Sequence, residues 1–135
     1  MPEAVIELLK ERRAHRIGLM GGTFDPVHRA HVEMARRAME QCALDAVLFL
    51  VSGDPPHKSA RAPAADRFAM LELALAKEPG LYPSRVELDR KGVVYTVDTL
   101  RILCGELPKA EFTYIVGADT FYDLSHGGWR NVEEI

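Results

Sequence analysis

A chain of 135 residues is long enough for one domain with a buried core, and its composition limits what that domain binds. The formal net charge is -3, and no block of Lys and Arg residues supplies the electrostatic footprint of a nucleic-acid-binding protein. No apolar run reaches the roughly 18 residues of a membrane span. The charged stretch 1–13 lacks the apolar core of a signal peptide. These features favour a cytoplasmic protein that binds neither nucleic acid nor a membrane.

The first predicted element is a short helix. Residues 5–13 have the spacing of an amphipathic helix ahead of the first strand. We interpret residues 1–14 as an N-terminal helical extension and residues 15–135 as the main domain.

The next segments alternate between strand and helix. An apolar strand is predicted at 16–20 and is followed by two glycines, and helix formers at 31–43 predict the first crossover helix. Residues 46–51 are apolar at every position, which is typical of a parallel strand covered on both faces. Three prolines predict a loop at 52–63, at the carboxyl end of that strand.

The alternation continues to the far end of the sequence. Residues 66–77 return to helical spacing, residues 84–88 are compatible with a short strand, residues 96–104 suit a helix and residues 112–116 a fourth strand. The pattern predicts an α/β fold with a doubly wound parallel sheet. Ligands of such sheets bind outside the carboxyl ends of the strands.

The two cysteines, Cys42 and Cys104, stand far apart, without a Cys-x-x-Cys pair or a companion histidine pattern. Their spacing predicts neither a zinc site nor a disulfide framework. We expect both to be small buried hydrophobic side chains in a reducing compartment.

The motif that carries chemistry follows the first strand. Gly21 and Gly22 allow main-chain N–H groups to approach a phosphate closely. His28 and His31 then stand one helical turn apart at the start of a helix, so that two imidazoles and a positive helix end converge on one anion. Such donors suit nucleotidyl transfer, in which negative charge builds on the α-phosphate during in-line displacement. A metal site or two unrelated surface residues are the weaker alternatives for this pair.

The run from Gly22 to His31 resembles the signature of the nucleotidyltransferases that carry a His-x-Gly-His motif. Ala30 stands where that superfamily usually has glycine. The resemblance implies a Rossmann-like nucleotidyltransferase fold, catalytic roles for both histidines, no resident metal, and Mg²⁺ that arrives with ATP. The ATP-binding residues that it implies in this segment are Gly21, Gly22, Thr23, Phe24, His28 and His31.

Three further segments are similar to the nicotinate-nucleotide adenylyltransferase branch of that superfamily. They are Pro55-Pro56-His57-Lys58, the Arg67-x-x-Met70 helix, and the stretch 87–100 with its Tyr95-Thr96-Val97-Asp98-Thr99 core. By this resemblance His57 and Lys58 meet phosphates, while Tyr95 and Thr96 lie at the pyridine carboxylate. A solvated charge at Lys58 and core packing at Tyr95 are the alternatives. Asp98 and Thr99 are expected to form a local network at the helix start.

Two more positions follow from the resemblance. Gly117-Ala118-Asp119 resembles the family's Gly-x-Asp, in which the acidic residue meets the adenosine ribose, with a helix N-cap as the alternative. Trp129 resembles the tryptophan that stacks near the nicotinate ring, after a loop about two residues longer than usual. The implied substrate-binding set is Ser52, His57, Lys58, Tyr95, Thr96 and Trp129.

Members of the family normally continue with a segment that bears Ile-Ser-Ser-Thr-x-Ile-Arg, and this sequence lacks it. We therefore expect the domain to lack its C-terminal segment. The leading hypothesis is transfer of AMP from ATP to nicotinate mononucleotide, which gives deamido-NAD and pyrophosphate in NAD biosynthesis. The alternatives are adenylyl or cytidylyl transfer to another phosphorylated metabolite and an inactive nucleotide-binding module. A homo-oligomer is compatible with all three.

Overall fold

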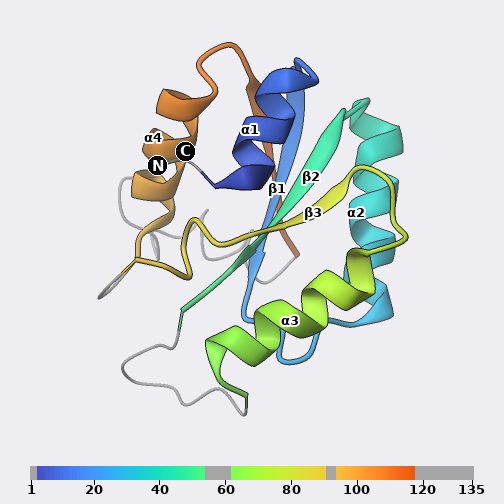
Figure 1. Cartoon of the computed structure of the whole chain (residues 1–135). Helices are drawn as coiled ribbons and strands as arrows, with labels where there is room; N and C mark the ends of the chain where they lie inside the picture. Colours follow the sequence, from blue (N-terminus) through green and yellow to red (C-terminus); the bar gives the residue numbers. More distant parts are fainter. Residues whose placement is uncertain (1–2, 54–61, 91–93, 118–135) are drawn as a thin grey trace.

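The computed structural model describes residues 3–53, 62–90 and 94–117, and their helices and strands alternate along most of the chain (Figure 1). The elements are α1 (Ala4–Glu11), β1 (Arg16–Gly22), α2 (Arg29–Cys42), β2 (Ala46–Val51), α3 (Ala64–Leu75), β3 (Leu81–Ser84), α4 (Thr96–Glu106) and β4 (Glu111–Ile115). The predicted α/β class is confirmed. None of these helices has the length and apolar character needed to cross a membrane.

The strands form one parallel sheet in the order β3-β2-β1-β4. From β1 the chain steps to β2 and then to β3 on one side, and it returns to place β4 on the other side of β1. The direction of winding therefore reverses between β1 and β4. In doubly wound sheets this reversal opens a crevice at the carboxyl ends of the two strands, where ligands bind.

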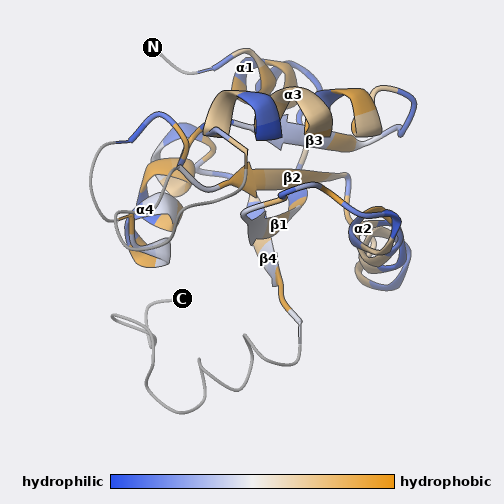
Figure 2. Cartoon of the chain, turned by 90° about the horizontal axis from the view of Figure 1, so that it is seen from below, coloured by the Kyte–Doolittle hydropathy of each residue, from blue (hydrophilic) through white to orange (hydrophobic). Residues whose placement is uncertain are grey.

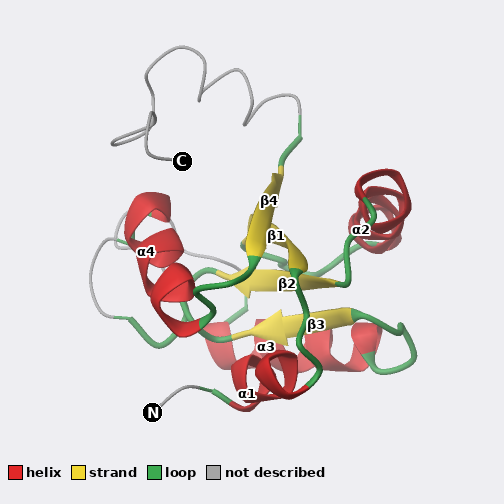
Figure 3. Ribbon diagram, turned by 90° about the horizontal axis from the view of Figure 1, so that it is seen from above, coloured by secondary structure: helices red, strands yellow, loops and turns green. Residues whose placement is uncertain are grey.

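The core lies on both faces of the sheet because β2 is buried at all six positions. Val47 and Phe49 pack into the cluster that includes Ala35 of α2 and Leu71 of α3. Ala46, Leu48 and Leu50 pack into a second cluster with Ile6 and Leu9 of α1 and Leu103 of α4. Figures 2 and 3 show α2 and α4 on opposite sides of the sheet, with apolar β2 between them.

The third strand begins earlier than predicted. Gly80 has a φ of 82°, which favours glycine, and the chain then enters β3 with the buried Leu81 opposite Val47. Pairing ends at Ser84, and the Asp89 N–H donates to the Arg85 carbonyl at 3.0 Å. The expected strand at 84–88 is therefore wrong, because the apolar alternation there belongs to a turn.

The cysteines also differ from the expectation. Cys104 is exposed on α4, next to the fully buried Leu103, and Cys42 is half-buried near the end of α2. The prediction that both are buried is wrong, because on an amphipathic helix a residue adjacent to the core-facing position points outward.

Candidate active site

The turn after β1 is held by an aromatic side chain. Phe24 has a φ of 50°, is 3 % exposed and packs on Phe49 with ring centroids 5.5 Å apart. Its ring also meets His31 edge-on at 5.2 Å. A Cβ at Gly22 would lie 3.2 Å from the Phe24 ring, so glycine permits this close packing. Phe24, predicted to bind ATP, thus places its ring in the core, where it packs against the ring of His31.

The two motif histidines lie at the start of α2, as the sequence indicated. His28 is the N-cap residue, with an extended backbone, and its N–H donates to Nδ1 of His31 at 2.8 Å. The two rings stack with centroids 5.4 Å apart. Because Nδ1 of His31 accepts a hydrogen bond, the proton of the neutral ring sits on Nε2. Burial, with a smaller contribution from His28, lowers the pKa of His31 below its ordinary value. His31 is therefore a neutral donor through Nε2.

The hydrogen bond between His28 and His31 affects whether the His-x-x-His pair could bind a metal ion. Nδ1 of His31 is engaged by the backbone of His28. Within the part of the chain that the structure describes, no group of three or more His, Cys, Asp or Glu side chains is arranged to hold a metal ion. The pair is better suited to donate hydrogen bonds to an anion.

A pocket of about 420 Å³ lies beside His31, at the carboxyl ends of β1 and β4 where the winding reverses. A Cβ at Gly21 would lie 3.4 Å from the Tyr114 hydroxyl, so the missing side chain leaves room in the pocket. A hollow of about 610 Å³ lies elsewhere on the surface, and one of about 700 Å³ borders this pocket, with which it shares Met34, Tyr114, Ile115 and Val116. Neither motif histidine lines either hollow. The pocket brings together five predicted site residues, namely Gly21, Gly22, His31, Thr96 and Gly117.

Two residues to which the sequence assigned no role in the site, Glu87 and Tyr114, also line the pocket. The Thr99 hydroxyl donates to Oε2 of Glu87 at 2.8 Å, and the hydroxyls of Tyr114 and Thr96 share a hydrogen bond. Burial raises the pKa of Glu87, against the opposing effects of Thr99 and Arg90. Burial also raises the pKa of Tyr114. The available signal for Tyr114 was its place near the carboxyl end of a predicted strand.

Arg67 of α3 ties together the loops that border the site. Its side chain is fully buried, and Nη1 donates to the carbonyls of Thr23 at 2.8 Å and Ser52 at 2.9 Å. Nε donates to the Ala62 carbonyl at 3.0 Å, and the Ser52 N–H donates to the Gly22 carbonyl at 3.0 Å. The segments after β1 and β2 are thus fastened side by side.

The other predicted site residues are dispersed. Tyr95 is the N-cap residue of α4 and is 37 % exposed, so it is not core packing. Ala30 is exposed in the first turn of α2. Asp98 accepts from Nη1 of Arg101 at 3.3 Å within α4, as expected for a local network at the helix start, whereas the Thr99 hydroxyl reaches Glu87, 12 residues earlier in the chain. The remaining predicted residues, His57, Lys58, Asp119 and Trp129, lie outside the described residues.

Residues 19–135 match the family described as cytidylyltransferase-like, which is most of the chain. The chain belongs to this family. Curated relatives of this cytidylyltransferase-like chain include the "Probable nicotinate-nucleotide adenylyltransferase" of Thermus thermophilus, 50 % identical over 120 residues, and that of Leifsonia xyli subsp. xyli, 44 % identical over 127. The matches cover 89 % and 94 % of this chain but 63 % and 62 % of the relatives. The chain thus spans about three fifths of their length.

Solved structures share the fold of this cytidylyltransferase-like chain. The Plasmodium falciparum nicotinic acid mononucleotide adenylyltransferase complexed with NaAD has a TM-score of 0.77 at 18 % identity, over 89 % of this chain and 59 % of that one. The same enzyme complexed with APC has a TM-score of 0.73 at 17 % identity, over 89 % and 58 %. The predicted Rossmann-like nucleotidyltransferase fold is confirmed.

Proposed function

We propose that the protein represented by this chain is a cytoplasmic nicotinate-nucleotide adenylyltransferase, which transfers AMP from ATP to nicotinate mononucleotide in NAD biosynthesis. The observation that carries this proposal is the pair formed by His28 and His31 at the N-terminus of α2, with His31 lining the pocket between β1 and β4. The curated relatives, which carry the name of this activity, support the choice of reaction.

The reaction needs no protein nucleophile. A phosphate oxygen of nicotinate mononucleotide attacks the α-phosphorus of ATP, and the new P–O bond forms as the bond to the β-phosphate breaks. Pyrophosphate leaves with the Mg²⁺ that entered with ATP. Donors from His28, His31 and the first N–H groups of α2 stabilise the negative charge that builds on the α-phosphate oxygens. The chain's contribution is to position the two substrates and to neutralise that charge.

The roles of individual residues extend this proposal. We assign ATP to the β1 end, with Gly21, Gly22 and Thr23, and to the β4 end, with Gly117 and Asp119. The space that glycine leaves at position 21 supports the first assignment. We assign the acceptor nucleotide to the wall formed by the start of α4, and Thr96 in the pocket supports this. The acceptor set is Ser52, His57, Lys58, Tyr95, Thr96 and Trp129.

The direct test measures pyrophosphate release from ATP, Mg²⁺ and nicotinate mononucleotide, for this chain and for a version extended at its C-terminus. In an active version, His28→Ala and His31→Ala should each lower kcat by about 100-fold to 1000-fold, because each removes a donor needed mainly in the transition state. His15→Ala, an exposed histidine ahead of β1, is the matched control and should retain turnover.

Near-normal kcat in both motif variants would rule out the assigned mechanism. Release only with a different phosphorylated acceptor would show that the acceptor is wrong. Nucleotide binding without release, in both versions of the chain, would identify an inactive binding module.

A further inference from the structure

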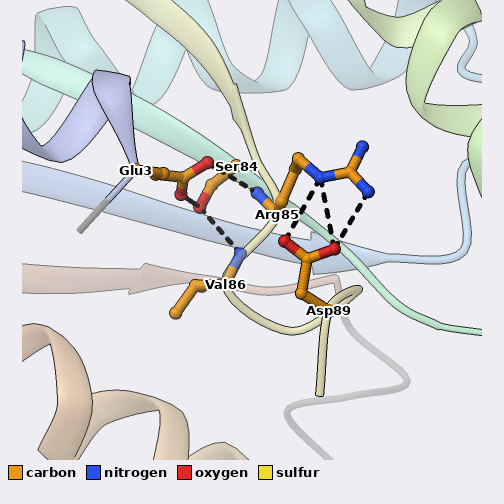
Figure 4. A network of polar contacts seen from close by, with 5 residues as sticks. All are labelled: Glu3, Ser84, Arg85, Val86 and Asp89. Atoms are coloured by element: carbon orange, nitrogen blue, oxygen red, sulfur yellow. Dashed lines mark hydrogen bonds and ion pairs between the residues drawn. The ribbon is translucent and has the colours of Figure 1, made fainter. Parts of the chain in front are cut away.

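Helix α1 contacts the end of β3 through the side chain of its N-cap residue, Glu3 (Figure 4). The Ser84 hydroxyl donates to Oε1 of Glu3, and the Arg85 N–H donates to Oε2 at 3.0 Å. Ser84 is fully buried, and its Oγ also accepts from the Val86 N–H at 3.3 Å. Both carboxylate oxygens of Glu3 are therefore engaged at the point where β3 becomes a turn.

The fold explains why Glu3 reaches this position. Ile6 and Leu9 of α1 are 3 % and 1 % exposed in the core cluster that also contains Leu103 of α4. The Glu3 carbonyl accepts from the N–H groups of Ile6 and Glu7 at 3.1 and 3.2 Å, so Glu3 starts the helix with its backbone while its side chain binds β3. Hydrogen bonds to an ionised carboxylate are stronger than neutral ones. The contact is thus held on one side by the packing of α1 in the core and on the other by the hydrogen bonds from Ser84 and Arg85 to Glu3.

The turn that follows Ser84 is closed by an ion pair and by a contact between a guanidinium and an aromatic ring. Arg85 Nη2 donates to Oδ1 of Asp89 at 2.9 Å, and its Nε lies 3.2 Å from both Asp89 oxygens. The Arg85 guanidinium also lies over the Phe68 ring, 5.0 Å from its centroid. These contacts tie Arg85, the first residue of the turn, to Asp89 at its end and to Phe68 of α3.

Glu87 lies inside this turn and connects it to the pocket. Its Oε2 accepts from the Thr99 hydroxyl at 2.8 Å, and the Thr99 N–H donates to the Tyr95 carbonyl at 3.2 Å. Thr96, one residue after Tyr95, lines the pocket together with Glu87. Hydrogen bonds and neighbouring residues in the chain therefore connect Glu3 to the wall of the pocket, through Arg85, Glu87, Thr99 and Tyr95.

We propose that Glu3 is a positioning residue for the acceptor side of the pocket: by fixing Ser84 and Arg85 it sets the place of Glu87, which holds the start of α4. This inference rests on the proposed function, because it assigns Tyr95 and Thr96 to the acceptor nucleotide. The cytidylyltransferase-like match begins at residue 19, so Glu3 acts from outside the matched region.

The experiment compares the parent chain, and its C-terminally extended version, with Glu3→Ala and with Glu7→Ala as the matched control. Glu7 is an exposed acid one turn further along the same helix. Glu3→Ala should raise the KM for nicotinate mononucleotide by about fivefold or more, the lower range of ordinary coupling between sites. The KM for ATP and kcat should change by less than about twofold. Glu7→Ala should change none of these quantities.

A second readout needs no catalysis. Hydrogen exchange of the amides in residues 85–90 and 94–100 should accelerate in Glu3→Ala and stay unchanged in Glu7→Ala. Glu3→Gln should restore slow exchange in large part, because its amide can accept from the Arg85 N–H and donate to the Ser84 oxygen. Ser84→Ala breaks the contact from the other side and keeps the test available if Glu3→Ala folds poorly. The double variant that combines Glu3→Ala with Ser84→Ala should exchange its amides little faster than either single variant.

Lower thermal stability with unchanged exchange at 85–90 and 94–100 would overturn the proposal and leave Glu3 as an anchor of α1 alone. Faster exchange with an unchanged KM for nicotinate mononucleotide would overturn the positioning role. If the parent versions transfer no adenylyl group, the proposed function fails separately. The exchange comparison then decides alone whether Glu3 holds this wall.

Discussion

The carboxyl group of Glu87 is subject to two opposing effects. Burial beside the pocket disfavours its ionised form and raises its pKa, whereas the Thr99 hydroxyl and Arg90 favour the carboxylate. Burial is the larger effect. The folded state therefore holds the proton of Glu87 to a higher pH than the unfolded chain does, and ionisation at neutral pH costs stability.

Glu87→Gln should remove this cost. The folded-state pKa is raised, so the stability contributed by Glu87 is fully present below the unfolded pKa of about 4.3 and is lost as pH rises through the folded value. Glutamine keeps an acceptor for Thr99 and has no proton to lose. The variant should gain free energy of unfolding relative to the parent as pH rises from 4 to 8, measured by urea unfolding at each pH. Asp89→Asn, an exposed acid in the same turn, should show no such gain. A stability difference independent of pH would contradict this account.

At the scale of an element, α3 supports the loops that border the site through the side chain of Arg67. Its guanidinium binds three backbone carbonyls, one from the segment after β1 and two from the segment between β2 and α3. A lysine ammonium is a compact charge without this planar set of donors, so it is a poor replacement.

Arg67→Met should lower the free energy of unfolding by at least about 2 kcal/mol, because three carbonyls lose a charged donor. Arg37→Met, an exposed arginine of α2 that pairs with Glu33, is the matched control and should change stability by less than about 0.5 kcal/mol. Guanidinium unfolding of the two variants gives the comparison directly. Equal losses in both would show that the carbonyl contacts of Arg67 contribute little.

The elements also show which features a sequence can predict. The bounds of β2 coincide with the apolar run, because a strand buried on both faces has an uninterrupted pattern. β3 was misplaced because it is short, contains Pro83 and is followed by a turn with strand-like alternation. The glycine and histidine motif could be predicted, since its residues are neighbours in the chain. The bond from Thr99 to Glu87 and the bonds of Arg67 could not, because they join residues 12, 15 and 44 positions apart.

At the scale of the whole molecule, the parallel sheet, whose winding reverses between β1 and β4, places the carboxyl ends of its strands and the N-termini of the helices that follow them at one end. The N-terminus of α4 lies at the same end of the sheet as the carboxyl end of β3, because α4 follows β3 and precedes the parallel strand β4. A helix N-terminus favours a negative charge. We therefore expect the acid form of the pyridine nucleotide to be the better acceptor.

The ratio of kcat/KM for nicotinate mononucleotide over nicotinamide mononucleotide should be at least about tenfold in an active, C-terminally extended chain. A carboxylate accepts hydrogen bonds at both oxygens, whereas an amide would turn its NH₂ toward the donors that we assign to the acceptor site at Tyr95 and Thr96. Each donor left unpaired costs about 1 to 3 kcal/mol. A ratio near one, or a preference for the amide, would show that the donor-lined pocket has been misplaced.

The core cluster shared by α1 and α4 has a consequence for the order in which the chain assembles during synthesis. Ile6 and Leu9 leave the ribosome early, but one of their partners in the cluster, Leu103, is made almost a hundred residues later. The unit from β1 through α2 to β2 is continuous in sequence and closes short loops, so it can form first. We expect α1 to bury its apolar face only in part, against β1 and β2, until α4 emerges. The cluster that contains Ile6 and Leu9 is therefore completed only after β1, α2 and β2 have formed.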